Sequence, residues 1–567
     1  MVAERTASCA IGLDFGTASV RAVLVETQTG TQRSSSVVAY AHGVIDARLP
    51  GSDGPLGADW ALQDPSDYLG AMESAVRAVL AGADVDPAAV VGIGVDFTSC
   101  TILPVDRIGW PLCLSKEYAG RPHAWVKLWK HHAAQPQADR INSIAAARQE
   151  PFLANYGGRT SSEWLVAKVL QIVDEDPGVY DAADAFVEGG DWVVWQLTGT
   201  LARNACAAGY KGFWTREHGF PSSAFFGALD PRLAVLPGTK LRGTITAPGR
   251  RVGTLTTAMA HRLGLSERTA VGAAIIDAHS AVPAAGVVTP GRMVLVMGTS
   301  TCHMLLADRH APVEGIGGIV WDGIVEGYYG YEAGQAAVGD LFAWCVRETG
   351  GSPENGEDFT ALEREAAAIA PGSHGLLALD WWNGNRSVLG NADLTGLLVG
   401  LTLSTTRGHI YRSLLEATGY GTRRILDAFD AQAIPVTELI AVGGLAERSP
   451  LLLQIYADVT QRPIRFATAD ACALGAAMLG AVAAGERMGG HSSLVEAAAR
   501  MTRLTGRQVE PNQDASRVYD ELYREYLELH DHFGRGGTDV MARLRSLHRT
   551  TQVAPITQHD SLASTTG

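Results

Sequence analysis

The sequence predicts an α/β protein built from two related large domains. Strand–helix order, which is typical of α/β architecture, occurs in both halves: helical spacing over 65–82 precedes an apolar strand over 90–95, and a strand over 439–442 precedes a second helix. The length of 567 residues exceeds what one domain normally holds. A strand–Gly-Thr–strand hairpin near the N-terminus returns almost 280 residues later, which indicates a duplication with a nucleotide clamped between the copies.

The first hairpin places a carboxylate beside a small-residue turn. An apolar strand ends near Asp14, the chain turns at Gly16 and Thr17, and an alternating strand resumes over 20–25. Backbone N–H groups in such turns suit phosphate oxygens, although most Gly-Thr turns are ordinary hairpin turns. Asp14 can therefore also be a simple turn former. Asp96 follows the 90–95 strand directly. Its role is left open: the side chain is either structural or close to the metal.

Asp277 organises the middle of the chain. It follows the apolar run 271–276 and opens a segment with helical character, so we expect its side chain in a cleft rather than in a core. About twenty residues later a strand breaks at Gly298, Thr299 and Ser300, whose N–H groups and hydroxyls suit polyphosphate oxygens. A carboxylate facing a phosphate cradle predicts phosphoryl transfer with Asp277 as the base. The alternative is that Asp277 merely caps a helix.

Three segments between these turns have weaker patterns. We expect residues 123–142 to be helical, with the paired histidines His131 and His132 on a solvated face rather than binding a metal. Residues 189–214, rich in tryptophan, are expected to form a loop that lines a pocket or a domain seam. Residues 221–236 are expected to be irregular.

The second half contains another candidate nucleotide contact. The 439–442 strand runs into Gly443 and Gly444, and Ser449 then precedes a helix as N-cap, with proline at the first helical position. Such a strand, glycine pair and helix start let a flat ring or a phosphate approach the backbone closely. The helix expected over 471–484 is rich in small residues, so another helix can pack close to it.

A cluster of glycine and proline at 286–291 predicts the domain boundary. We therefore expect a first domain over 9–286, a second over 287–500, amphipathic helices over 501–548 and a disordered tail over 549–567.

Composition excludes several classes of function. A net charge of −14 and a pI near 5.6 argue against nucleic acid and anionic membrane surfaces as partners. Seven scattered cysteines without a CxxC pair fit reduced thiols and offer no zinc template. No apolar run approaches the roughly 20 residues that span a bilayer, and no signal peptide is evident. We expect a cytoplasmic protein with a small-molecule substrate, and a homodimer is left open.

Longer motifs resemble a known family. A pattern of the FGGY carbohydrate kinases, within the actin-like, ribonuclease-H-like ATPases, is present at Gly396, Leu398, Gly400, Leu401, His409, Ile410, Leu415 and Glu416. Strings resembling the L-ribulokinase branch of this family lie at 123–135, 191–199, 207–214, 330–340 and 379–387. The resemblance spans about 10–485 and implies two actin-like domains with a nucleotide and sugar cleft between them.

The resemblance also implies an activity and its residues. It implies phosphorylation of L-ribulose at the C5 hydroxyl in L-arabinose catabolism, with ATP and Mg²⁺ as cofactors and Asp277 as general base. Asp14 would help to position Mg²⁺, and the sugar would contact Lys211, Glu332 and the backbone near Ser99, besides Asp277. The implied ATP contacts are Gly16, Thr17, Gly298, Thr299, Ser300, Gly443, Gly444 and Ser449. Ser449 stands where the family commonly has Asn.

Other functions are left open by the sequence. The substrate can be another ketopentose or a pentitol, such as D-ribulose or ribitol. An actin-like protein that binds ATP without catalysis is a second alternative. Such a protein needs no sugar pocket, so Lys211, Glu332 and the tryptophan-rich segment argue against it. Lys211 can be a solvated lysine, and Glu332 can pair structurally with an arginine.

Overall fold

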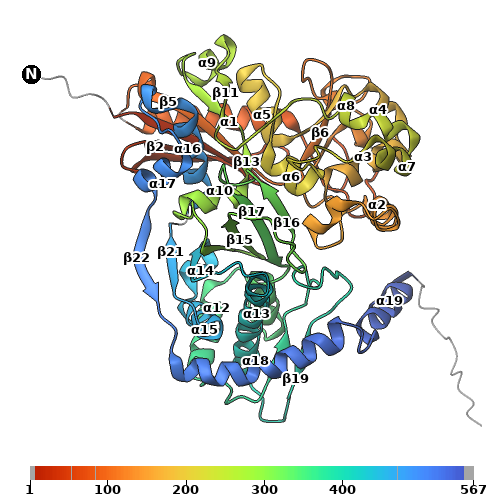
Figure 1. Ribbon diagram of the computed structural model, residues 1–567, viewed down its shortest axis with the longest axis vertical. Helices are drawn as coiled ribbons and strands as arrows, with labels where there is room; N and C mark the ends of the chain where they lie inside the picture. Colours follow the sequence, from red (N-terminus) through yellow and green to blue (C-terminus); the bar gives the residue numbers. More distant parts are fainter. Residues whose placement is uncertain (1–6, 53, 84, 469, 554–567) are drawn as a thin grey trace, which may run out of the picture.

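The computed structural model of the chain describes residues 7–52, 54–83, 85–468 and 470–553, and two large sheets lie one above the other along its long axis (Figure 1). The first sheet has the order β11-β12-β5-β1-β2-β3, and β13 also pairs with β5. Its strands are β1 (Cys9–Phe15), β2 (Ser19–Glu26), β3 (Gln32–Ala39), β5 (Val90–Phe97), β11 (Arg251–Thr254), β12 (Ala270–Gly272) and β13 (Ile275–Ile276).

The second sheet repeats the topology of the first. Its order is β16-β17-β15-β14-β20-β21-β22, and its strands are β14 (Arg292–Met297), β15 (Thr301–Ala307), β16 (Gly318–Trp321), β17 (Tyr329–Gln335), β20 (Glu438–Val442), β21 (Ile464–Ala467) and β22 (Leu504–Val509). In each sheet an antiparallel meander of three strands (β1-β2-β3 or β14-β15-β17) is extended by two parallel strands (β5 and β12, or β20 and β21). The predicted α/β duplication is confirmed, and with it the paired hairpins.

Two helices lie between the sheets and hold them together. Helix α10 (Asp277–Ala284) follows the first sheet, whereas α16 (Ala471–Ala484) follows the second sheet yet packs on β1 and β5 of the first. A Cβ atom on Gly12 would collide with the α16 backbone at Ala473, and one on Gly475 would collide with Ser280 of α10. The close packing predicted for the small-residue helix is confirmed, because these contacts need glycine.

A four-stranded sheet with flanking helices extends the first lobe (upper right in Figure 1). Its strands are β4 (Leu62–Gln63), β6 (Ile102–Val105), β7 (Val126–Lys127) and β8 (Ala185–Glu188). The helices of the first lobe are α1 (Pro65–Gly82), α2 (Gln135–Ala147), α3 (Leu165–Glu175), α4 (Pro177–Ala182), α5 (Gly189–Thr198), α6 (Ala205–Gly212), α7 (Ser223–Leu229), α8 (Leu236–Thr239) and α9 (Thr257–Leu263). A small sheet pairs β9 (Ala202–Asn204) with β10 (Thr244–Thr246).

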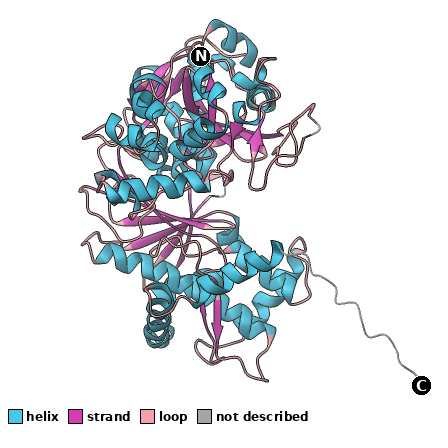
Figure 2. Ribbon diagram, turned by 90° about the vertical axis from the view of Figure 1, so that its right-hand side faces the viewer, coloured by secondary structure: helices cyan, strands magenta, loops and turns pink. Residues whose placement is uncertain are grey.

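The second sheet has helices above and below it (Figure 2). The remaining helices are α11 (Gly339–Glu348), α12 (Gly356–Ala367), α13 (Arg407–Asp430), α14 (Gly444–Arg448), α15 (Pro450–Thr460), α17 (Leu494–Met501), α18 (Gln513–Gly534) and α19 (Val540–Val553). Two short strands, β18 (Leu377–Leu379) and β19 (Leu397–Val399), pair beside them. As predicted, Ser449 caps α15: its hydroxyl accepts a hydrogen bond from the Leu452 N–H, with Pro450 at the first helical position.

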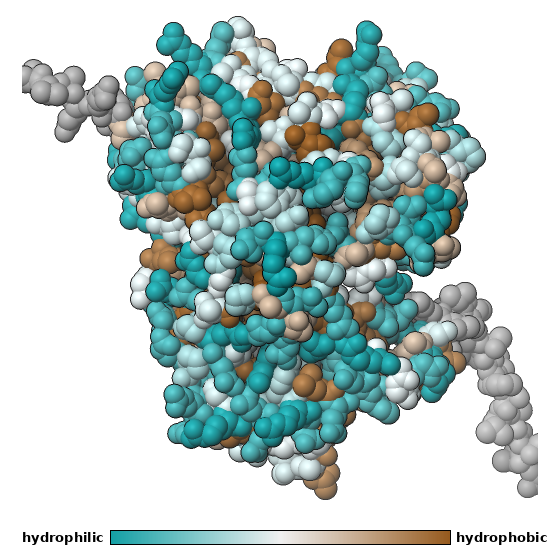
Figure 3. Space-filling model, viewed as in Figure 1, coloured by the Kyte–Doolittle hydropathy of each residue, from teal (hydrophilic) through white to brown (hydrophobic). Residues whose placement is uncertain are grey.

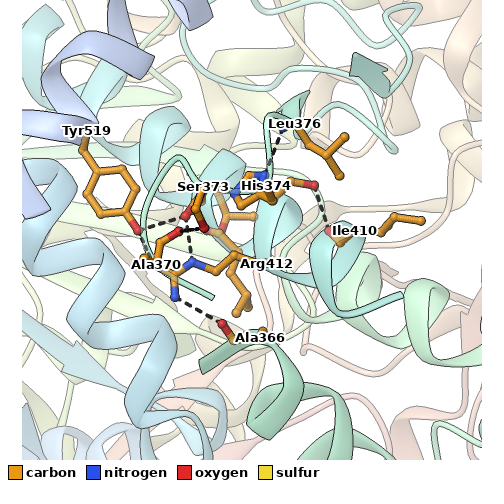
Figure 4. A network of polar contacts seen from close by, with 12 residues as sticks. Ala366, Ala370, Ser373, His374, Leu376, Ile410, Arg412 and Tyr519 are labelled. Atoms are coloured by element: carbon orange, nitrogen blue, oxygen red, sulfur yellow. Dashed lines mark hydrogen bonds and ion pairs between the residues drawn. The ribbon is translucent and has the colours of Figure 1, made fainter. Parts of the chain in front are cut away.

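The motif that ends at Glu416 serves the fold of the second lobe (Figure 4). The buried Glu416 carboxylate accepts hydrogen bonds from Arg412 Nε at 2.7 Å and from the Tyr519 hydroxyl at 2.9 Å, and lies 3.0 Å from His374 Nε2. His374 Nδ1 in turn accepts from the Leu376 N–H. The network ties α13 to α18 and to the segment before β18, so this motif stabilises packing.

The helix predicted over 123–142 is wrong in its first half. Residues 122–124 form one turn of 3-10 helix, residues 126 and 127 form β7, and the α-helix begins only at Gln135, as α2. Lys127 pairs through its backbone with Leu62 and Ile102, so strand pairing overrides the helical spacing. His131 is fully buried rather than on a solvated face, and Lys127 is fully buried as well.

Two predicted irregular segments are helical, and helix α19 extends into the segment predicted as a tail. Residues 189–214 form α5, β9 and α6, with Trp192 and Trp195 buried, and residues 221–236 contain α7 and the start of α8. Most apolar side chains of both segments are buried, so burial and not periodicity decides their structure. Helix α19 reaches Val553, past the predicted start of the disordered tail at 549; residues 554–567 lie outside the described part of the chain.

The surface mixes polar and apolar residues. The face in Figure 3 is mostly hydrophilic, with hydrophobic residues in small separate groups. Within the described ranges, no helix is both long and apolar enough to cross a membrane.

Candidate active site

Three carboxylates meet at one edge of the first sheet. Asp14 near the end of β1 lies in register with Asp96 on β5, and Ile275 of β13, two residues before Asp277, pairs with Asp96 from the other side. Asp277 is the first residue of α10, and its Oδ1 accepts from the Ala278 N–H at 2.6 Å. Ile276 occupies the N-cap position, so Asp277 is not the helix cap. Its carboxyl group remains half-buried.

The environment of Asp277 suits a base. Burial raises its pKa to about 7; the charges of Asp14 and Glu332 also raise it, and the Ala278 N–H and Lys211 lower it. Burial likewise raises the pKa of Asp14, and burial with the charges of Asp14 and Asp277 raises that of Asp96 well above its usual range. A base is most effective when its pKa lies near the working pH.

The pair of Asp14 and Asp96 fits a magnesium ion that arrives with a nucleotide. Both are hard oxygen donors, and neither Asp96 oxygen accepts a hydrogen bond from the described residues, although the side chain is fully buried. The described ranges contain no group of three or more His, Cys, Asp or Glu arranged to hold a metal by themselves. Mg²⁺ commonly takes one or two carboxylates and completes its shell with phosphates and water. The residues present fit that mode of binding.

An ion pair joins the two lobes beside Asp277. Lys211 Nζ, from α6 of the first lobe, donates to both carboxylate oxygens of Glu332, from β17 of the second, at 3.0 and 2.9 Å. Burial alone would lower the pKa of Lys211, but the Glu332 charge raises it overall; burial would raise the pKa of Glu332, and Lys211 lowers it overall. Both groups are therefore charged. Lys211 is buried, not solvated, and Glu332 pairs with a lysine instead of an arginine.

A histidine that sequence reasoning missed completes this cluster. His279 lies two residues after Asp277 and is 2% exposed, and its Nε2 is 3.4 Å from Glu332 Oε2. Its ring packs at 4.4 Å from that of Tyr210. Burial lowers its pKa, so the ring is neutral. The only feature of the sequence that could have indicated a role for His279 is its position, about half a helical turn after Asp277.

The two predicted phosphate turns are built alike. Gly16 N–H donates to the Ser19 carbonyl at 3.0 Å in the first, and Gly298 N–H donates to the Ser300 carbonyl at 2.9 Å in the second. The N-terminus of α11 fixes the second turn, because Gly339 N–H donates to the Gly298 carbonyl at 3.1 Å. Gly298 and Thr299 are exposed and Ser300 is half-buried, so the turn is open to a ligand.

The glycine pair adjoins the second turn, whereas Ser449 is engaged elsewhere. A Cβ on Gly443, whose φ is +105°, would lie 2.5 Å from the Met297 carbonyl oxygen, at the end of the strand that leads into Gly298. Gly443 thus allows a close approach that other residues would block. The Ser449 hydroxyl lies 2.9 Å from Glu363 Oε1 and caps α15, so an adenine contact from Ser449 stays a prediction.

Hydrogen bonds from Trp129 and from Gln63 of β4 anchor the first turn at Thr17. Trp129 Nε1 donates to the Thr17 hydroxyl at 3.0 Å, and Gln63 Nε2 donates to the Thr17 carbonyl at 2.7 Å. Ser99 lies half-buried in the loop after β5. Burial raises the pKa of the neighbouring Cys100 thiol to about 12, and the nearby charge of Lys211 opposes that rise. Of the residues predicted to contact a sugar, Lys211 and Glu332 lie near Asp277, and the contact expected from Ser99 stays a prediction.

Comparisons with known proteins show the family of the chain and agree with its fold. Residues 9–283 match the model of the N-terminal domain of the FGGY family of carbohydrate kinases, and residues 293–484 match that of its C-terminal domain. The chain is 54% identical to a ribulokinase of Shouchella clausii, over 95% of this chain and 97% of that one. It is 52% identical to a ribulokinase of Geobacillus thermodenitrificans, over 96% and 98%. A crystal structure of gluconate kinase from Lactobacillus acidophilus shares the fold, with a TM-score of 0.77 at 17% identity over 94% and 99% of the chains.

Proposed function

The chain belongs to the FGGY family of carbohydrate kinases, and we propose that it transfers the γ-phosphoryl group of ATP to the C5 hydroxyl of L-ribulose. Relatives named ribulokinase, 52–54% identical over nearly the whole chain, support ribulose as the substrate. Phosphorylation at C5, the L configuration and a place in L-arabinose catabolism are the finer parts of the proposal.

One observation carries the mechanism: burial raises the pKa of the Asp277 carboxyl group to about 7, and Asp14, Glu332 and Lys211 are close enough for their charges to shift it. A sugar hydroxyl is a poor nucleophile. Asp277 accepts its proton as the new O–P bond forms, which contributes about 10²–10⁴-fold to the rate. The same carboxylate orients the hydroxyl before transfer.

The other residues bind and align the two substrates. Lys211 donates to the sugar's oxygens and Glu332 accepts from its hydroxyls, in charge-assisted hydrogen bonds. The exposed turn at Gly298 and Thr299 and the turn at Gly16 and Thr17 hold the phosphates. Asp14 and Asp96 would hold Mg²⁺, which would neutralise phosphate charge.

Location and assembly are further parts of the proposal. All seven cysteines lie in the described part of the chain and are free, which supports a reducing compartment such as the cytoplasm. A homodimer is the assembly that this proposal allows.

We expect L-ribulose to give the highest kcat/KM in a panel of pentuloses and pentitols, because Lys211 and Glu332 fix the orientation of one acceptor. The measurement is ATP-dependent product formation, with the phosphorylated carbon assigned by NMR. A preference for D-ribulose or ribitol would move the specificity to the alternative substrates. ATP binding without phosphorylation of any member of the panel would contradict the proposed function.

A further inference from the structure

A buried lysine outside the residues discussed so far binds three backbone carbonyl groups at once. Lys168, on α3, is fully buried, and its Nζ donates to the carbonyls of Cys100 at 2.6 Å, Leu128 at 2.8 Å and Lys127 at 3.4 Å. A protonated amine carries three N–H donors and no acceptor, which matches three carbonyl oxygens. Burial lowers its pKa to about 8, so the amine stays protonated at neutral pH.

The carbonyls that Lys168 binds belong to the two sides of the candidate site. Cys100 directly follows Ser99 in the loop after β5, on the sugar side. Leu128 directly precedes Trp129, whose indole N–H donates to Thr17 in the first phosphate turn. One amine therefore connects the loop of the expected sugar contact with the segment that holds the nucleotide side.

The conformation of the Ser99–Cys100 loop depends more on Lys168 than the conformation of the turn at Gly16 and Thr17 does. Cys100 has a φ of +56°, a left-handed conformation that is unfavourable for a residue with a Cβ and needs support from outside the loop. The Cys100 carbonyl receives that support from Lys168. Thr17, in contrast, has a second anchor in Gln63 and lies in a hairpin of the main sheet.

We propose that Lys168 is a positioning residue that fixes the Ser99–Cys100 loop against residues 127–129 and so places the sugar relative to the phosphate turn. The inference rests on the proposed function, since it assumes that Ser99 contacts the acceptor sugar. Lys168 itself has no access to substrate, because its side chain is fully buried.

The chain offers a matched control in Lys127. Its side chain is also fully buried, but among the described residues its amine has no hydrogen-bond partner and lies over the Trp60 ring at 4.2 Å. Lys127→Met removes a buried amine without breaking a hydrogen bond, whereas Lys168→Met removes three. The backbone carbonyl of residue 127 is unchanged in both variants.

The test compares the parent, Lys168→Met and Lys127→Met. We expect Lys168→Met to lower kcat/KM for L-ribulose by about 10- to 100-fold, the effect of losing hydrogen bonds to a charged group, while KM for ATP changes less than about 3-fold. Lys127→Met should keep both constants near those of the parent. Amide hydrogen exchange in residues 98–101 should be faster in Lys168→Met than in Lys127→Met, because local opening of the loop costs less.

The outcomes separate this inference from the proposed function. Parental kinetics and exchange in Lys168→Met would overturn it, and so would equal losses for sugar and ATP, which indicate a general loss of structure. If Lys168→Met does not fold, Lys168→Arg takes its place, because a planar guanidinium cannot aim its donors at three converging carbonyls, and the same difference between sugar and ATP is required. If the parent phosphorylates no pentulose, the proposed function fails, and hydrogen exchange alone decides whether Lys168 holds the loop.

Discussion

We expect that replacing Asp277 by Asn lowers kcat for sugar phosphorylation by about 10²–10⁴-fold while the protein stays folded. Asn has the same shape, and its Oδ1 can still accept from the Ala278 N–H, but it cannot take a proton from the sugar hydroxyl. The measurement is ADP release at saturating sugar and ATP, together with a thermal unfolding curve.

Asp458→Asn is a suitable control for the Asp277 variant. Asp458 is also buried and burial raises its pKa, but its carboxylate accepts from the Asn512 N–H and from Gln454, where α15 meets the start of α18. Its replacement should change stability and leave kcat near the parental value. If Asp277→Asn behaved in the same way, Asp277 would not be the base.

Replacing Lys211 by Met is expected to weaken both sugar binding and the folded state. The substitution leaves the Glu332 carboxylate, 13% exposed, without its partner, and removing one member of a buried ion pair costs about 3–5 kcal/mol of unfolding free energy. Sugar binding loses a charged donor at the same time. Chemical denaturation measures the first effect and calorimetric titration with L-ribulose the second.

A double variant distinguishes these two roles. Lys211→Met with Glu332→Gln removes the unpaired charge, so it should recover much of the lost stability but none of the sugar affinity. Parental stability and affinity in Lys211→Met would instead show that the ion pair between the lobes contributes to neither.

Local patterns predicted several elements of the fold and of the candidate site. The apolar strand that ends near Asp14, the helix over 65–82 and the small-residue helix over 471–484 follow from period, cap and composition, and the structure has both helices at those residues. Asp277 was predictable because a carboxylate directly after an apolar strand and at a helix start faces outward from both cores.

Long-range pairing accounts for what the sequence did not reveal. Lys127 lies in a strand because of partners at Leu62 and Ile102, and nothing in its neighbourhood signals them. Lys168 meets Cys100 across 68 residues of sequence, and His279 meets Glu332 from a different lobe. Such contacts have no local pattern, because the sheet topology alone brings the segments together.

The pH dependence of kcat/KM for L-ribulose tests most directly whether the Asp277 carboxylate takes the proton. This constant reports ionisation in the free enzyme. Because burial raises the pKa of Asp277 to about 7, the base is increasingly protonated and inactive at lower pH. The predicted profile falls about tenfold per pH unit below that pKa and is level above it. A profile that stays flat from about pH 5.5 to 8 would contradict it, since the proton would then go to a group other than Asp277.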